Sequence, residues 1–212
     1  MPALKTVEYL IKSAKDGNCV EIGRALDQGC DINAEEGGAL YWSVLRGHAD
    51  AVNLLLSRGA DPNARRTAAL AVAARDGKID IAVRLLDSGA ALNSDYDCPL
   101  RCAAKSGHDN IVALLLARGA DVHARDDDVI QTAVYNGCNE TMALLLAQGG
   151  YPPKVLTKVR AVAMQIGLLE VVAMIESART MAKLSKSSNA MPPATCAEAP
   201  PSSNLAGAVW RL

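Results

Sequence analysis

The sequence contains no phenylalanine and few aromatic residues of any kind, which make up 3% of its 212 residues. Sandwiches and barrels are built from strands rich in aromatic and β-branched side chains, so this composition argues against both. Half of the residues are nevertheless hydrophobic, which is enough to bury a continuous core. The composition therefore predicts an all-α protein with small apolar side chains packed between helices.

The sequence also lacks a large net charge of either sign and a long run of apolar residues. The chain has 22 Lys plus Arg against 23 Asp plus Glu, so the field that drives sequence-independent binding of nucleic acid is absent. No apolar stretch approaches the roughly 18 residues of a membrane span, and the N-terminal residues do not resemble a signal peptide. Six scattered cysteines without a CxxC pair suit reduced thiols. We expect a cytoplasmic protein with neither a nucleic-acid nor a membrane partner.

The spacings that build common active sites are absent as well. The sequence has no HExxH, GxSxG, Walker-type loop or GxGxxG, so we expect no enzyme, cofactor or metal site. His48 and His108 each follow a glycine that recurs every 30 residues. His123 takes the place of the asparagine in a recurrent motif of the type GADxN. Local hydrogen bonds and a turn role are favoured over catalysis for these three histidines.

Acidic residues gather in two consecutive turns, at Asp95, Asp97 and 126–128. Oxygen ligands of this kind suit a divalent cation, but the spacing does not match an EF-hand and Arg125 lies beside the group. We interpret the turns as a solvated acidic edge. The column Glu35, Arg65, Asp95 and Arg125 alternates in sign and predicts surface ion pairs worth at most about 1 kcal/mol each.

A strict internal repeat organises the chain. One series of glycines recurs every 30 residues, and the phrases GCDIN, GADPN, GAALN and GADVH follow a second series with the same step. Such regularity predicts a one-dimensional array in which each unit contacts only its neighbours. The first series is Gly17, Gly47, Gly77, Gly107, Gly137 and Gly167, and the second is Gly29, Gly59, Gly89, Gly119 and Gly149.

The residue pattern of each unit predicts two helices. The column Leu10, Leu40, Leu70, Leu100 and Ile130 supplies an apolar core anchor in the first helix. Three residues later stands a small residue, Ser or Ala, which allows close approach of helices. Segments such as HDNIVALLLARG have the apolar spacing of an amphipathic second helix. The glycine that ends each second helix is expected to be a left-handed C-cap.

The segment CPLRCAAKSGHDNIVALLLARGADVHA, residues 98–124, resembles an ankyrin repeat. The resemblance covers about residues 6–184 and implies a curved solenoid of helix-turn-helix units. Typical units have about 33 residues, whereas these have 30. The shortening lies before the first helix, so we expect short turns in place of the family's β-hairpin fingers.

We divide the chain into an ankyrin repeat domain, 1–184, and a disordered tail, 185–212, because the tail is rich in Ser, Pro and Ala without periodicity. Polar substitutions such as Arg160, Glu170, Glu176 and Arg179 mark the last unit as a cap. The units lie near 6–35, 36–65, 66–95, 96–125 and 126–155, with the C-terminal cap at 156–184.

The function that the resemblance implies is a non-enzymatic module that binds an unidentified partner protein on its concave face, acting as a monomer. Two alternatives remain open at this point. The chain could be a self-associating structural protein, or a secreted effector whose tail serves as an export signal.

Candidate contact residues come from the positions just before the unit glycine, which face the groove in this repeat type, and from the turns. Arg and Tyr often dominate binding energy at interfaces. Tyr41 and Trp42 occupy columns that elsewhere hold alanine and valine, so Trp42 has a competing interpretation as core. The protein-binding candidates are Tyr41, Trp42, Arg46, Arg66, Arg75, Asp76, Tyr96, Lys105, Asp127, Tyr135 and Asn136.

Overall fold

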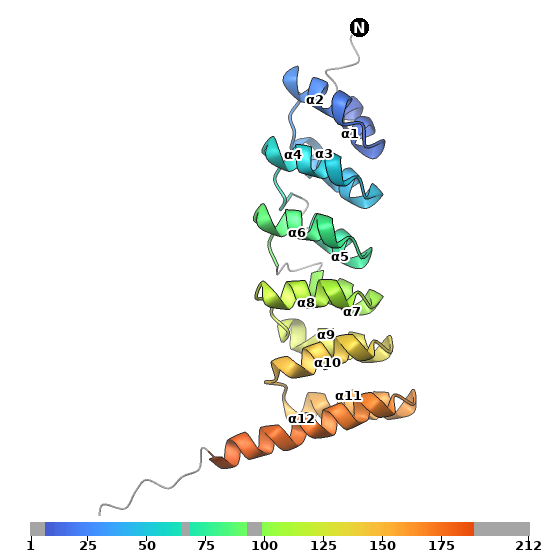
Figure 1. Ribbon diagram of the computed structural model, residues 1–212, viewed down its shortest axis with the longest axis vertical. Coiled ribbons are helices and arrows are strands. Elements are labelled where there is room, and N and C mark those ends of the chain that lie inside the picture. The colour runs from blue at the N-terminus through green and yellow to red at the C-terminus, as the bar shows by residue number, and fades with distance from the viewer. Residues whose placement is uncertain (1–6, 65–67, 93–98, 189–212) are drawn as a thin grey trace, which may run out of the picture.

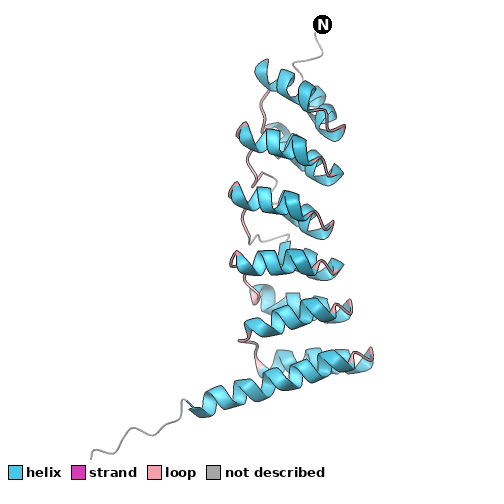
Figure 2. Ribbon diagram, in the orientation of Figure 1, coloured by secondary structure: helices cyan, strands magenta, loops and turns pink. Residues whose placement is uncertain are grey.

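The computed structural model describes residues 7–64, 68–92 and 99–188, and every regular element in these ranges is an α-helix (Figure 2). Six helix pairs are stacked one above the next (Figure 1). The predicted all-α solenoid is thus confirmed. The helices are α1 (Val7–Lys15), α2 (Cys19–Asp27), α3 (Ala34–Arg46), α4 (Ala49–Ser57), α5 (Ala68–Arg75), α6 (Ile79–Asp87), α7 (Pro99–Ser106), α8 (Asp109–Ala117), α9 (Ala124–Tyr135), α10 (Asn139–Gln148), α11 (Pro153–Gln165) and α12 (Leu169–Ser188).

The core runs the length of the stack between two rows of helices. Each odd-numbered helix packs against the next odd-numbered helix, and each even-numbered helix packs against the next even-numbered one. The predicted anchor column is at most 1% exposed from Leu10 to Ile130. The small-residue column is buried too, and its two serines, Ser13 and Ser43, donate to backbone carbonyls of their own helices. Small side chains therefore let the first helices approach one another closely.

The recurrent glycines end the helices as predicted. Gly59 has a φ of +91°, in the left-handed region that glycine adopts without the strain of a Cβ. The amide of Gly59 donates to Leu56 O, and that of Ala60 donates to Leu55 O. These two bonds form the motif that satisfies the last carbonyls of an α-helix. The same pair of bonds ends α2, α6 and α8.

The first turn of α3 has a left-handed backbone and forms a kink inside the helix as bounded above. Glu35, Glu36 and Gly37 have φ values of 52°, 56° and 79°. A Cβ on Gly37 would lie 2.4 Å from the Cβ of Ala64 in the next connection. Successive turns therefore pack directly on one another, in agreement with the short turns expected from the 30-residue repeat.

Hydrogen bonds between units involve the residue after the first glycine. His48 Nε2 lies 2.9 Å from Lys15 O, and His108 Nε2 lies 2.9 Å from Arg75 O. Lys78 occupies the same place and its Nζ donates to Val44 O at 3.0 Å. The expectation of local hydrogen bonds at the histidines was wrong, because each ring binds the end of the preceding unit's first helix.

The asparagine of the recurrent phrase also joins neighbouring units. Asn33 Oδ1 accepts from the amide of Asp61, and Asn63 Oδ1 accepts from the amide of Ala91, both at 2.8 Å. His123 stands at this position before α9, but its Nδ1 lies 2.5 Å from Asp127 Oδ1. The expected turn position is therefore kept, while the side chain bonds within its own unit.

The C-terminal cap extends beyond the range expected for it. α11 begins at Pro153, a position favoured for proline in the first helical turn. α12 runs to Ser188, and neither Gly nor Pro occurs between Leu184 and Ser188 to end it earlier. The cap helices thus span 153–188 instead of 156–184, and residues 189–212 of the expected tail lie outside the described residues.

Polar residues of the cap pair with one another. Arg160 of α11 forms an ion pair with Glu176 of α12, and Arg179 lies 3.8 Å from the same carboxylate. Arg160 occupies the column that holds a buried leucine or isoleucine in earlier units. A charged residue is tolerated at this position because no further helix pair of the described residues covers it, as is typical of a terminal unit of a solenoid.

Candidate protein-binding surface

Four of the eleven predicted contact residues form one row along the first helices. Arg46, Arg75, Lys105 and Tyr135 are exposed, and each lies at or next to the C-terminal end of its helix, α3, α5, α7 or α9. Tyr135 is 66% exposed, the most of any tyrosine in the described residues. Because these helices lie in consecutive layers, their C-terminal ends follow one another along the long axis of the stack (Figure 1).

Buried alanines hold this row in place. Ala73, Ala74, Ala103 and Ala104 precede the exposed residues on α5 and α7 and are fully buried. A small side chain locked against the neighbouring helix leaves little freedom to the backbone that carries the exposed residue. The row is therefore a rigid surface, which lowers the entropy lost when a partner binds.

Arg75, Asp76 and Lys78 form a compact charged cluster between α5 and α6. The Asp76 carboxylate accepts 2.8 Å bonds from Arg75 Nε and from Lys78 Nζ. The bond from Arg75 is the main reason that the pKa of Asp76 is lowered, and burial of the carboxylate opposes this shift. The same bond raises the pKa of Arg75. Asp76 is thus committed to its neighbours, while the Arg75 side chain remains 52% exposed.

Tyr41 and Trp42 lie on α3 as an edge-to-face aromatic pair with ring centroids 5.8 Å apart. The ammonium of Lys15, from the preceding unit, lies 4.0 Å from the centroid of the Trp42 ring, a cation–π geometry. Tyr41 and Trp42 are half-buried. Trp42 does not belong to the hydrophobic core of the described residues, so it is available at the surface beside the lysine.

Asp127 is buried, whereas the sequence predicted it in an exposed turn. Its side chain is 8% exposed and bonded to His123, so it does not form part of an exposed turn. Its φ of +60° turns the carboxylate inward, toward the histidine ring. Asn136 is exposed, but its side-chain amide donates to Thr132 O at 2.8 Å. Arg66 and Tyr96 lie outside the described residues.

The sequence analysis did not identify Lys15 as part of this surface. It also did not identify the contacts that His48, Lys78 and His108 make with the preceding unit. Lys15 shares its repeat column with Arg75 and Lys105, so the 30-residue register could have identified it. The packing of His48, Lys78 and His108 against the preceding unit had no signal in the sequence, because it depends on the distance between layers.

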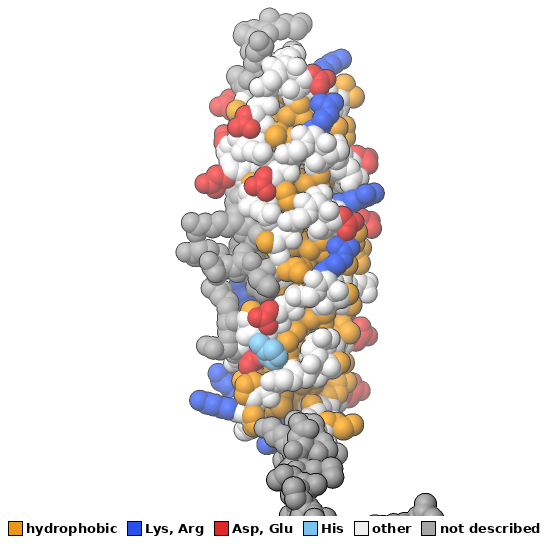
Figure 3. Space-filling view, turned by 90° about the vertical axis from the view of Figure 1, so that its left-hand side faces the viewer, with side chains coloured by type: hydrophobic (Ala, Val, Ile, Leu, Met, Phe, Trp, Pro, Cys, Tyr) orange, Lys and Arg blue, Asp and Glu red, His pale blue; other side chains and the backbone are white. Residues whose placement is uncertain are grey.

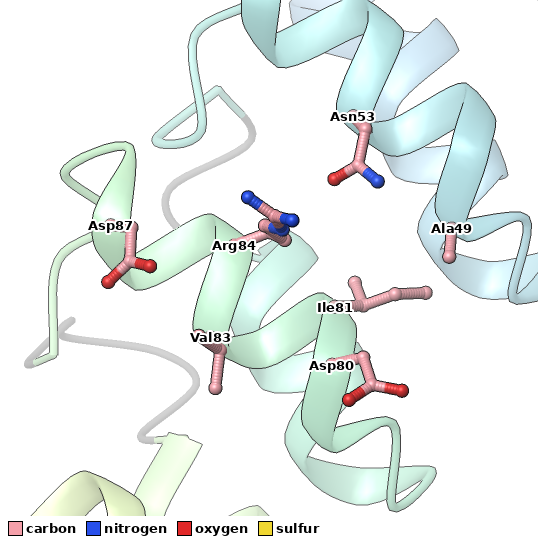
Figure 4. A pocket seen from close by; sticks show the side chains of 7 residues that line it. All are labelled: Ala49, Asn53, Asp80, Ile81, Val83, Arg84 and Asp87. Carbon is pink, nitrogen blue, oxygen red and sulfur yellow. The ribbon is translucent and has the colours of Figure 1, made fainter.

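A shallow hollow lies between α4 and α6, on the second helices (Figure 4). It has a volume of about 350 Å³, and Arg84, Asp80 and Asp87 line it together with Asn53. Its lining holds two carboxylates, Asp80 and Asp87, and no Ser, Cys or His. None of the predicted contact residues lines this hollow.

The described residues contain no group of three or more His, Cys, Asp or Glu side chains placed to hold a metal ion. Asp95 and Asp97 of the two acidic turns, and the Arg65 and Asp95 members of the alternating charge column, lie outside these residues. No helix within the described ranges combines the length and the apolar character needed to cross a bilayer.

Figure 3 shows the side of the stack along which the units are connected. Charged side chains of both signs are distributed over this side, some of them next to each other, and apolar side chains lie among them. Among the described residues on this side, no patch of a single charge sign of the kind that attracts nucleic acid is visible. An excess of positive charge lies instead at the C-terminal ends of the first helices, where Arg46, Arg75 and Lys105 stand.

Comparison with protein-family models identifies the repeat. A model of three ankyrin repeats matches residues 64–126, and a model of one ankyrin repeat matches residues 39–67. A search of curated proteins gave no match. Ankyrin repeats generally serve as protein-protein interaction modules, and proteins built from them are typically non-enzymatic. These matches show that the chain contains ankyrin repeats between residues 39 and 126.

Proposed function

We propose that this chain is a non-enzymatic module that binds a partner protein along the concave side of the stack, on the first helices of units two to five. The observation that carries the proposal is the row of exposed Arg46, Arg75, Lys105 and Tyr135 on four consecutive units. A row on a rigid repeat array presents an extended surface rather than a pocket. Arg and Tyr supply large contact areas and directed hydrogen bonds on such surfaces.

The aromatic pair of α3 extends this surface toward the N-terminal unit. Trp42 offers an apolar plane beside the Lys15 ammonium, and Tyr41 packs edge-on against it. Tryptophan and tyrosine beside a cation are typical of positions that contribute strongly to binding. Asp127 is no longer part of the proposed surface, because it is buried.

The test is binding by variants with an intact fold. Proteins captured from native lysate by the unaltered chain would be compared with those captured by Arg75→Ala combined with Tyr135→Ala. We expect the double variant to lose at least about tenfold in affinity for the captured partner, since each position would contribute on the order of 1 kcal/mol or more.

A matched control places two substitutions on the second helices, Arg58→Ala and Arg118→Ala. These arginines are exposed and lie in units two and four. Loss of binding by the control, with full binding by the first-helix variant, would move the proposed surface to the convex side. Sedimentation of the unaltered chain as a monomer would argue against self-association as its main role.

A further inference from the structure

Cations on the two sides of the stack differ in how they are neutralised. On the second helices, Arg58 pairs with Asp27 at 2.8 Å and Arg118 pairs with Asp87 at 2.9 Å. Each pair joins one unit to the preceding unit at the same place in the repeat. The acidic partner of each of these arginines is thus supplied by the chain itself.

The first helices of units one to four carry an excess of positive charge. Among the six residues before the unit glycine, these units hold six basic and two acidic residues. Asp76 is one of the two acids, and it is already shared by Arg75 and Lys78. The basic residues are Lys12, Lys15, Arg46, Arg75, Arg101 and Lys105.

Four of these cations have no carboxylate within ion-pair distance in the described part of the chain, namely Lys12, Lys15, Arg46 and Lys105. Basic residues near a helix C-terminus also interact favourably with the helix dipole. The dipole alone does not account for the asymmetry, because second helices also end in basic residues, with Arg58 and Arg118 at the C-caps of α4 and α8, and these two arginines are paired with carboxylates of the chain. The excess belongs to the surface proposed to bind the partner.

The spacing of this charge is set by the stack. Packed helices lie about 8–10 Å apart, so equivalent side chains on consecutive units are separated by about 10 Å. An extended chain advances about 3.3 Å per residue. A segment that lies along the first helices would therefore meet a new unit, and a new cation, about every three residues.

We infer that the partner contributes an extended acidic segment whose carboxylates, about three residues apart, pair with Lys15, Arg46, Arg75 and Lys105. This inference rests on the proposed function and names the chemistry of the partner. The segment ends toward Tyr135, where the cationic row stops and the exposed aromatic ring accepts an apolar side chain.

Fluorescence anisotropy with synthetic peptides tests the inference. The probe is a labelled peptide of about twelve Ser and Ala residues with Glu at every third position. One comparison peptide has the same composition with its four glutamates consecutive, and another has Lys in place of Glu. We expect the spaced peptide to bind at least about fivefold more tightly than the clustered one, and the lysine peptide not to bind.

The matched variants reverse three charges on each side of the stack. Lys15→Glu, Arg46→Glu and Lys105→Glu together should weaken binding of the spaced peptide at least about tenfold. Circular dichroism and thermal unfolding verify that the variant folds. The control reverses three cations of the second helices and should bind the peptide as the unaltered chain does. It carries Arg58→Glu, Arg84→Glu and Arg118→Glu.

The remaining outcomes count against the inference. Equal binding of the spaced and clustered peptides would contradict an extended segment with carboxylates three residues apart. If neither peptide binds, the partner segment is not acidic. Tighter binding of a single-stranded oligonucleotide of the same charge would replace the protein segment by a nucleic acid. If the peptides fail while Arg75→Ala with Tyr135→Ala still abolishes partner capture, the proposed function stands and only the acidic chemistry is wrong.

Discussion

The imidazole of His48 reaches across a unit boundary to the carbonyl of Lys15, with 2.9 Å between Nε2 and O. Lys15 is the last residue of α1, so its carbonyl has no acceptor role left within the helix. The ring lies against Gly17, where a Cβ would stand 2.6 Å from two of its atoms. The His48 ring therefore provides a hydrogen-bond partner for the last carbonyl of α1, and it leaves no room for a side chain at position 17.

His48→Ala should lower the free energy of unfolding by about 1 kcal/mol, because the carbonyl of Lys15 loses its partner and the two units lose packing. His48→Lys should retain most of the stability, since Lys78 makes the equivalent bonds to Val44 O and Leu45 O one unit later. Urea unfolding followed by circular dichroism measures both. Equal loss in the two variants would show that the inter-unit bond contributes little.

Gly17→Ala and Gly59→Ala should differ in cost although both glycines have positive φ. A Cβ at Gly59 meets no described atom within 4 Å, so only backbone strain of about 1 kcal/mol is expected. Gly17→Ala adds a clash with the His48 ring and should cost more. Gly59→Val should exceed Gly59→Ala, because β-branching adds strain.

A double-mutant cycle separates the two contributions at Gly17. In the His48→Ala background the clash is absent, so Gly17→Ala should cost only about as much as Gly59→Ala. An unchanged excess cost in that background would mean that the ring is not what excludes a side chain at this position.

Asp76→Asn should destabilise the protein by about 0.5–1 kcal/mol at neutral pH, in keeping with a partly exposed ion pair. The lowered pKa of Asp76 means that the carboxylate stays charged to lower pH in the folded state than in the unfolded chain. Its contribution is therefore complete above about pH 5 and is lost as the pH falls through the folded pKa.

Thermal unfolding between about pH 2 and pH 7 checks this dependence. The difference between the unaltered chain and Asp76→Asn should be constant at higher pH and should vanish in acid. A stability difference that grows in acid would contradict the assigned direction.

A chain that ends at Pro152 should aggregate, because removal of α11 and α12 exposes apolar side chains of the fifth unit. Leu145 is fully buried and Leu146 is 9% exposed, and α10 packs against α12. Light scattering and thermal unfolding are the measurements. A chain that ends at Ser188 should match the full-length protein, and a soluble, equally stable chain ending at Pro152 would contradict the capping role.

Much of the surface was predictable because it follows the repeat register. Arg46, Arg75, Lys105 and Tyr135 were identified from their distance to the unit glycine, and all four are exposed. Asp127 failed the same reasoning, since a turn position does not determine whether a side chain points outward. The buried bond from His123 to Asp127 required knowledge of the backbone, including a positive φ that aspartate seldom adopts.

The sequence by itself determined the number of units, the boundaries between their helices and the identity of the core columns, because a strict 30-residue period repeats the same local rules of helix formation and capping. Only the tertiary structure decided which side chains bridge the layers. Whether His48 meets Lys15 or Asn63 meets Ala91 depends on the separation and twist of stacked units, and these follow from packing of the whole array rather than from any one repeat.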